Sequence, residues 1–255
     1  MVCSDTVSVD IIPVLLLLGR PAAGKSEIID YLQRQEEGER RARFHLGPLT
    51  VLDDFPILWS WLEEDELLQH MGRPRLHTTP EGYFSQRHSW DVLIQMLCLA
   101  HGKACADDPA GGNGRTFIME FARGTEHGGY RAALDTLTGE VAARASILYV
   151  QVSYEESARK NRRRFNPKRA HSILEHGLSD EKMERLYRRD DWQELLVASG
   201  GARNPPAGGA VEIQGRMVPA VTMENEDDVT TPRGPELGSR LEECLDLLWR
   251  LHGRR

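Results

Sequence analysis

The sequence of 255 residues has few cysteines and no excess of basic residues. Its four cysteines form no C-x-x-C pair and no zinc-ligand spacing. A disulfide framework is therefore not indicated, and we expect free thiols in a reducing compartment. The formal net charge is -7 at pH 7, whereas a protein that coats nucleic acid is usually basic. DNA is not an expected partner.

Long apolar runs are also lacking. No segment approaches the roughly 20 apolar residues needed to span a bilayer. The apolar run 11–18 is short, follows a stretch that contains Asp5 and Asp10 but no lysine or arginine, and ends in Gly-Arg-Pro rather than in small residues. A secretory signal peptide has the opposite features. We therefore expect a cytoplasmic protein without a membrane partner.

What the sequence does contain is a globular composition, with 40% hydrophobic and 28% charged residues. Apolar runs of strand length lie at 11–18, 49–52, 116–121, 146–152 and 218–223. None alternates cleanly between polar and apolar residues, which is typical of a parallel sheet covered on both faces. Helical patterns separate these runs, so the chain is predicted to form right-handed βαβ units in a single α/β domain, 1–255.

Helices are expected between and after the strands, at 26–35, 56–71, 82–101, 130–143, 154–165 and 236–251. The segment 56–101 would form a helical insertion after the second strand. Two stretches rich in glycine, proline and alanine, 102–115 and 199–210, are expected to be surface loops, and 211–218 to turn back as a small hairpin.

The most specific motif is G-x-x-x-x-G-K-S, which follows the first apolar run and opens an amphipathic helix. Its glycines allow backbone amides to surround an anion, and the helix adds the positive end of its dipole. The motif resembles the phosphate-binding loop of P-loop NTPases, which implies ATP and Mg²⁺ as ligands. The resemblance implies phosphate contacts from Lys25, a metal contact from Ser26, and a nucleotide-binding backbone formed by Gly19, Arg20, Pro21, Ala22, Ala23, Gly24, Lys25 and Ser26.

Two acids, Asp53 and Asp54, end the second apolar run. The stretch resembles the D-D-F-aromatic sequence of uridine and nicotinamide riboside kinases, with Pro56 in place of the aromatic residue. This resemblance implies that one acid orients or deprotonates the accepting hydroxyl. We expect Asp53 to contact the acceptor and Asp54 to cap the following helix, although the exchanged assignment stays open.

Glu120 ends the third apolar run and resembles a Walker B acid, which implies a metal contact or a place near the acceptor. Arg123 follows it and would bind the acceptor at the mouth of the cleft, but a role as a solvated loop residue is equally open. In the insertion, Tyr83 and Arg87 are further acceptor-binding candidates. The aromatic residues around them could stack on a base or form a core.

The basic run 159–164 follows the fourth strand. Arg159 and Arg163 share one helix face because they lie four residues apart. The run resembles the start of the lid of gluconate-type kinases, which implies that these arginines close over the phosphates and that a mobile, charged lid extends over about 166–192. A plain solvated helix face is the alternative.

The last motif is the acidic turn after the fifth apolar run, which contains Asn225. It resembles the turn that borders adenine in many nucleotide and nucleoside kinases, so Asn225 is a nucleotide-binding candidate. Glu226 stands where the guanine-reading N-K-x-D motif has lysine. ATP is therefore expected rather than GTP.

In this order the motifs resemble the small-molecule kinase branch of the P-loop NTPases. The resemblance implies a three-layer fold with a mainly parallel five-stranded sheet, order 2-3-1-4-5, helices on both faces, a helical insertion and a lid. It implies ATP- and Mg²⁺-dependent phosphoryl transfer to a hydroxyl-bearing nucleoside, sugar or vitamin, with catalytic residues Lys25, Asp53, Asp54, Arg159 and Arg163. Alternatives are an ATPase or nucleotide switch without such an acceptor, and a zeta-toxin-like kinase of sugar nucleotides. The acceptor and the oligomeric state are not indicated.

Overall fold

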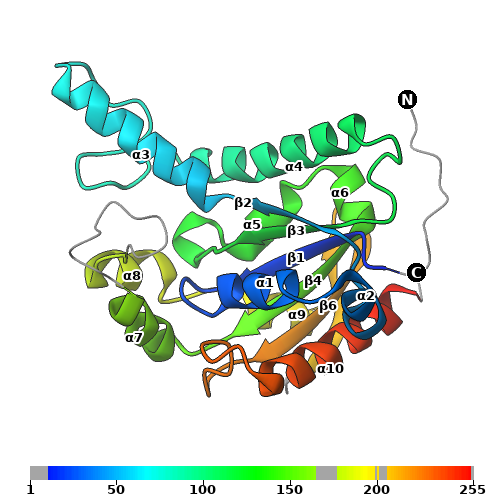
Figure 1. Ribbon diagram of the computed structural model, residues 1–255. Helices are drawn as coiled ribbons and strands as arrows, with labels where there is room; N and C mark the ends of the chain where they lie inside the picture. The colour runs from blue at the N-terminus through cyan, green and yellow to red at the C-terminus, as the bar shows by residue number, and fades with distance from the viewer. Residues whose placement is uncertain (1–10, 165–176, 199, 201–205, 254–255) are drawn as a thin grey trace.

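The structure is a computed structural model that describes residues 11–164, 177–198, 200 and 206–253. A six-stranded sheet, in the order β2-β3-β1-β4-β6-β5, forms its centre (Figure 1). Every neighbouring pair is parallel except the β5–β6 hairpin. The strands are β1 (Val14–Gly19), β2 (Leu49–Asp53), β3 (Thr116–Phe121), β4 (Ala145–Gln151), β5 (Ala207–Ile213) and β6 (Arg216–Glu224).

Strand β1 lies in the middle of the sheet and is buried along its whole length. Val14, Leu16 and Leu18 belong to the core on one face of the sheet, whereas Leu15 and Leu17 belong to the core on the other. A strand covered on both faces requires apolar side chains at every position. This requirement explains why the sequence VLLLLG does not alternate.

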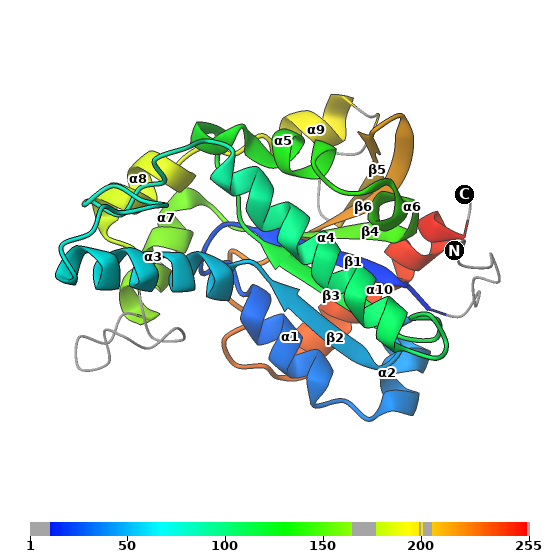
Figure 2. The same ribbon diagram turned by 90° about the horizontal axis from the view of Figure 1, so that it is seen from above.

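Helices cover both faces of the sheet, so the protein has the expected three-layer α/β architecture (Figure 2). One face is covered by α1 (Lys25–Gln33), α2 (Glu37–Phe44) and α10 (Pro235–His252). The other is covered by α4 (Ser89–Asp107), α5 (Gly129–Asp135), α6 (Gly139–Arg144) and α9 (Trp192–Ala198).

Beyond the carboxyl ends of the parallel strands lie α3 (Phe55–His70), α7 (Tyr154–Arg164) and α8 (Asp180–Tyr187), on the left in Figure 1. A single 3-10 turn, η1 (Thr125–His127), follows β3. Among the helices in the described part of the chain, none combines the length and the apolar character that crossing a membrane requires.

The predicted insertion is a pair of helices, α3 and α4, joined by an irregular segment, 71–88. Asp65 of α3 organises this segment, because its buried carboxylate accepts hydrogen bonds from the backbone N–H groups of Leu76, His77 and Thr78. The prediction of a helix over 82–101 was wrong at both ends, since α4 begins at Ser89 and continues to Asp107. The first part of the expected loop 102–115 is therefore helical.

The predicted sheet order was incomplete. The fifth expected strand is β6, and a sixth strand, β5, pairs antiparallel with it at the edge of the sheet. Gln214 and Gly215, with φ of 50° and 76°, form the tight turn between them. The sequence AGGAVEI gives little strand signal because it is rich in small residues. Pairing with β6 makes it a strand, so the hairpin expected at 211–218 is longer than predicted.

Two further helix predictions differ from the structure. The single helix expected over 130–143 is divided into α5 and α6, because the Thr138 hydroxyl accepts a hydrogen bond from Val141 N and begins a new helix. Helices α2, α8 and α9 were not predicted. The loop prediction at 199–210 lies largely outside the described residues, which omit 199 and 201–205.

The lid expected over about 166–192 also lies partly outside the described residues, which omit 165–176. Its described part contains the buried side chains Met183, Tyr187 and Trp192, which the charged composition of the segment did not indicate. The mobility of the lid stays a prediction. Trp192 stacks on Tyr149 of β4 with ring centroids 4.6 Å apart, and its Nε1 donates to Thr222 Oγ1 of β6 at 2.9 Å. These contacts anchor the end of the segment to the sheet.

Candidate functional site

The loop between β1 and α1, Gly19–Ser26 and hereafter the glycine loop, depends on both of its glycines. Gly19 has φ of 153° and Gly24 has φ of 107°. A Cβ on Gly19 would lie 2.7 Å from Val150 O, and one on Gly24 would lie 2.4 Å from Thr230 Oγ1. Other residues rarely adopt these φ values, and neither position has space for a side chain. The spacing of the two glycines in the motif therefore follows from the backbone geometry.

Arg20 connects the glycine loop to the segment that follows β4, to the last residue of α8 and to the segment that follows α8. Its Nη1 donates to Val152 O at 3.0 Å, and its Nε donates to Tyr187 O at 3.2 Å. Its Nη2 forms an ion pair with Asp190 Oδ2 at 2.7 Å, in which both side chains are largely buried. The Arg20 side chain thus points away from the interior of the loop and fixes its position.

Asn225 supports the glycine loop from β6. Its side chain is fully buried, and Nδ2 donates to Ala23 O and to Thr230 Oγ1, both at 2.8 Å. The predicted contact between Asn225 and the base is therefore corrected, because the amide is used to hold the loop. A second support comes from α7, where Ser157 Oγ donates to Pro21 O at 2.7 Å.

Lys25 is buried at the start of α1. Its Nζ donates to Gly19 O and Arg20 O, each at 3.0 Å, and lies 3.8 Å from Glu120 Oε1. Burial lowers the pKa of Lys25, and the charge of Glu120 opposes this shift. Next to it, Ser26 is exposed in the first turn of α1. The loop thus holds one cation internally and leaves one hydroxyl accessible.

Asp53 and Glu120 lie opposite each other at the ends of the paired strands β2 and β3. Burial raises the pKa of Asp53 to about 6, although the Phe55 N–H group, which donates to Asp53 Oδ1 at 2.9 Å, opposes the shift. Burial likewise raises the pKa of Glu120 to about 7, against the opposing charge of Lys25. Two carboxyl groups with raised pKa values therefore lie near Lys25 at these strand ends.

The cation of α7 that faces these acids is Arg164. Burial lowers the pKa of Arg164, and the carboxylates of Glu27, Glu120 and Asp53 oppose the shift, which places the guanidinium within their electrostatic reach. The spacing of the basic run predicts Arg159 and Arg163 instead. Spacing along a helix identifies residues that share a face, but it does not show which face is turned toward the site.

Arg159 and Arg163 face the loop after β6 rather than the acids. Arg163 Nη2 lies 3.2 Å from Asp228 Oδ2 and 3.0 Å from Thr231 Oγ1. Arg159 forms a close pair with Glu156 at 2.6 Å. Both arginine side chains are about half exposed, 51% and 52%. In this structure they are engaged at the rim, and their role over the phosphates stays a prediction.

Asp54 and Arg123 form a buried ion pair, with Arg123 Nη1 2.7 Å from Asp54 Oδ2. The exposed fractions of the two side chains are 9% and 2%, so Arg123 is not at the mouth of a cleft. Asp54 makes no capping hydrogen bond to α3, whereas Asp53 accepts one from Phe55 N. Asp54 was expected to cap α3 and Arg123 to face the acceptor. In the structure the two side chains bind each other instead.

The aromatic side chains of the insertion contact one another. Trp61 lies edge-on to Phe84, and Phe84 lies edge-on to Trp90, with centroids 5.8 Å and 4.7 Å apart. Trp90 stacks on His127 at 3.8 Å, and His127 meets Tyr187 of α8 at 5.7 Å. These rings therefore pack against one another as a local core, which was the alternative to stacking on a base.

The other acceptor-side candidates lie around this core. His127 is buried, neither ring nitrogen has a hydrogen-bond partner, and burial together with Arg123 and Arg185 lowers its pKa to about 3. Tyr83 is covered by Arg185 of α8, whose guanidinium carbon lies 4.2 Å from the ring centroid. Arg87 is exposed and approaches the backbone of the loop that follows β3, near Gly128.

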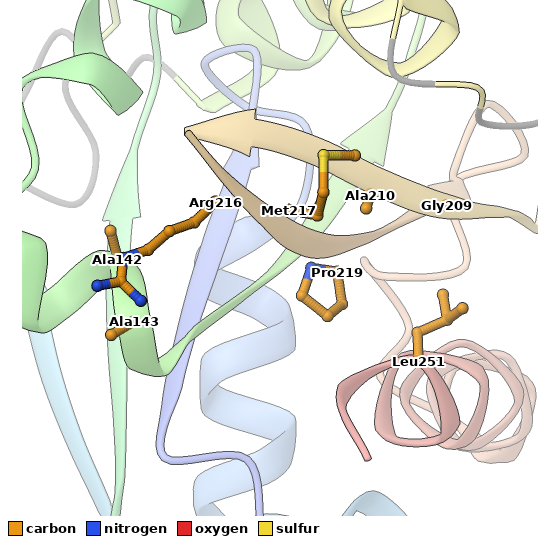
Figure 3. A pocket seen from close by; sticks show the side chains of 8 residues that line it. All are labelled: Ala142, Ala143, Gly209, Ala210, Arg216, Met217, Pro219 and Leu251. Carbon is orange, nitrogen blue, oxygen red and sulfur yellow. The ribbon is translucent and has the colours of Figure 1, made fainter. Parts of the chain in front are cut away.

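A pocket of about 560 Å³ lies elsewhere, near the amino ends of β4 and β6 (Figure 3). Its lining consists mainly of small apolar residues and contains no acid and no nucleophile; the lining residues are Ala142, Ala143, Gly209, Ala210, Arg216, Met217, Pro219 and Leu251. The candidate site residues of the motifs are at the other end of the strands, where open α/β sheets bind their ligands.

The comparisons with known proteins do not identify a family. No family model matches the chain, and no curated protein matches it. Among solved structures, the chain is similar to one described as "Crystal structure of APE1195", with 15% sequence identity, a TM-score of 0.40 and coverage of 94% of this chain and 99% of that chain. A likeness of this size supports no statement about activity.

The requirement for glycine in the loop can be tested by substitution of Gly24. We expect Gly24→Ala to lower the free energy of unfolding by about 1–3 kcal/mol, because a Cβ would enter the space of Thr230. The matched control is Gly38→Ala in α2, where no atom lies within 4 Å of the added Cβ. The control should be neutral or stabilising by up to about 1 kcal/mol. Urea unfolding measures both, and equal effects would contradict the requirement for glycine.

The raised pKa of Glu120 predicts a pH-dependent stability. The folded state holds the Glu120 proton more tightly than the unfolded chain, because the folded pKa of about 7 exceeds the ordinary 4.5. Stability is therefore lost as pH rises through this interval, and Glu120→Gln, which cannot ionise, avoids the loss. In Mg²⁺-free buffer the stability of Glu120→Gln relative to wild type should increase from about pH 5 to about pH 8. A difference that does not change with pH would contradict the shift.

Proposed function

We propose that this protein transfers the γ-phosphoryl group of ATP, with Mg²⁺, to a hydroxyl group of a small acceptor, as P-loop kinases do. The observation that carries the proposal is the glycine loop, in which Lys25 Nζ lies 3.0 Å from two loop carbonyl oxygens and 3.8 Å from Glu120. A pre-formed loop, a buried cation and two neighbouring acids are the parts that phosphoryl transfer needs.

The nucleotide phosphates would bind to the backbone amides of the glycine loop and to the amino end of α1. Lys25 would then exchange its hydrogen bonds to Gly19 O and Arg20 O for bonds to phosphate oxygens. Its interaction with phosphate is strengthened by burial, because a low dielectric constant increases the attraction between charges. Arg164, within reach of the same acids, is the second cation suited to stabilise the charge that develops during transfer.

The residues at the site fit a Mg²⁺ ion. Ser26 offers an exposed hydroxyl and Glu120 a carboxylate, and both are oxygen donors of the kind that Mg²⁺ prefers. Burial raises the pKa of Glu120 despite the opposing charge of Lys25, so a further cation beside the carboxylate would be favourable. A bound Mg²⁺ would supply neutralisation of the phosphate charge.

Asp53 is the better candidate for the general base. Asp54 is committed to Arg123 in a buried pair, whereas Asp53 is only partly buried and has a pKa of about 6. In the proposed step the acceptor oxygen forms a bond to the γ-phosphorus, the bond to the ADP oxygen breaks, and the acceptor proton passes to Asp53. A base with a pKa near the working pH suits this role.

The acceptor would enter beside Asp53, between the insertion and the loop that follows β3. Arg87 is exposed there and is retained as an acceptor-binding candidate, and Tyr83 lies on the same connecting segment. Arg123 is instead assigned a positioning role through Asp54. The acceptor class, a nucleoside, sugar or vitamin, is left to experiment.

The proposal is tested by measuring ATP consumption and product formation with panels of nucleosides, sugars, vitamins and sugar nucleotides. We expect Lys25→Ala to abolish turnover, because the phosphate cation is lost, while the fold is retained. The matched control is Lys103→Ala, an exposed position on α4, which should keep full activity. ATP binding without transfer to any acceptor would favour the ATPase or switch alternative, and unchanged turnover in Lys25→Ala would remove the glycine loop from the reaction.

Substitutions of the two neighbouring acids are predicted to have different effects, one on the transfer rate and the other on stability. Asp53→Asn should lower the transfer rate by about 10²-fold or more with little change in ATP affinity. Asp54→Asn should instead lower the free energy of unfolding by about 3–5 kcal/mol, because Arg123 loses its buried partner. Transfer assays and urea unfolding on both variants provide the comparison. Full transfer activity in Asp53→Asn would exclude it as the base.

A further inference from the structure

His101, Cys105 and Glu140 meet at the end of the molecule opposite to the glycine loop. His101 and Cys105 lie in the last two turns of α4, and Glu140 lies in the first turn of α6 (right in Figure 1). One possible ligand atom from each residue lies within 4.8 Å of the other two. In the described part of the chain this is the one group of three or more histidine, cysteine and acidic side chains gathered so closely.

The geometry of the helical pair suits a shared metal ion. His101 and Cys105 are four residues apart on α4 and therefore project from the same face. His101 Nε2 lies 3.6 Å from Cys105 Sγ. A tetrahedral zinc ion with a nitrogen at about 2.0–2.1 Å and a sulfur at about 2.3 Å separates these two atoms by about 3.6 Å. The pair already has the required spacing.

Packing holds the pair in place and leaves the third residue accessible. The exposed fractions of His101 and Cys105 are 1% and 7%, and the His101 ring meets Phe117 edge-on at 4.6 Å. Glu140 is exposed on α6, so an ion could reach the group from that side.

The charges also favour a divalent ion. A thiolate from Cys105 and the carboxylate of Glu140 would together neutralise Zn²⁺, so the bound complex would carry no net charge. The mixed sulfur, nitrogen and oxygen set suits zinc better than magnesium or calcium, which prefer oxygen ligands. A Cys–His nucleophile is less compatible, because Cys105 is buried and Gly112 packs against it so closely that a Cβ there would lie 2.7 Å from Sγ.

We propose that His101, Cys105 and Glu140 bind one Zn²⁺ ion, with water as the fourth ligand, and that this ion joins α4 to α6. The site is independent of the proposed phosphotransferase site, since its residues lie near the amino ends of the strands. It links two helices of the same outer layer that are far apart in the sequence. Metal binding to the folded state alone would stabilise that layer.

The test uses the full chain after removal of metals with a chelator. Addition of Co²⁺ alone should produce a thiolate-to-cobalt charge-transfer band that saturates at one ion per chain, and Zn²⁺ should displace it. Cys105→Ser should lose the band. The matched control is Cys244→Ser, because Cys244 is also buried but packs in the core on the other face of the sheet, and it should keep the band.

Glu140→Gln provides the second measurement, because an exposed side chain can be changed without disturbing the core. Its affinity for Zn²⁺ should fall at least about tenfold, since even the outer partners of metal ligands contribute about 10–100-fold. Circular dichroism without metal verifies that each variant is folded. The proposal is overturned if wild type shows no charge-transfer band, or if Glu140→Gln binds Zn²⁺ as tightly as wild type. A band that persists in folded Cys105→Ser also overturns the proposal. The contact between Cys105 Sγ and His101 Nε2 in the wild type would then be only a weak hydrogen bond.

Discussion

The glycine loop is held in one shape by segments that are distant in the sequence, and the arrangement of the candidate site depends on this support. Val150 O packs against Gly19, Ser157 Oγ bonds to Pro21 O, and Asn225 Nδ2 bonds to Ala23 O. These contacts come from β4, α7 and the end of β6. These contacts hold backbone groups of the loop from outside, and Lys25 Nζ donates to two of its carbonyl oxygens.

Buried charge at the carboxyl ends of the strands is arranged in two separate sets. Asp54 and Arg123 compensate each other fully at 2.7 Å, and this pair positions the start of the insertion. Lys25 and Glu120 are 3.8 Å apart, and the charges of Lys25 and Arg164 act on Asp53 without offsetting the effect of its burial. An incompletely compensated set of buried acids has raised pKa values, which is the usual state of groups that bind metals or move protons. The same strand ends thus contain one compensated ion pair and one group of acids with raised pKa values.

The insertion and α8 are linked through side chains rather than through the sheet. The rings of Trp90, His127 and Tyr187 are in contact, and the carbonyl oxygen of Tyr187 accepts a hydrogen bond from Arg20 of the glycine loop. The region expected to cover an acceptor is therefore in physical contact with the region expected to bind phosphate. Trp192, stacked on Tyr149, anchors the same segment to the sheet.

Local sequence was sufficient for features that depend on backbone geometry and periodicity. The apolar runs predicted the parallel strands, the two glycines and Lys25 predicted the turn between β1 and α1, and the positions of Asp53 and Glu120 after apolar runs placed them at one edge of the sheet. These predictions succeeded because strand direction and spacing alone decide where such residues lie.

Tertiary packing decided the rest. The orientation of α7 brings Arg164 within electrostatic reach of the acids, Asp54 pairs with Arg123, and Asn225 lies beneath the loop. Packing also made a strand of 207–213 and brought His101 together with Glu140. The spacing of residues along the chain does not predict these contacts. Each one joins segments that come together only when the sheet has formed. The sequence by itself determined the framework and the loop; the partner of each buried charge was set by the fold.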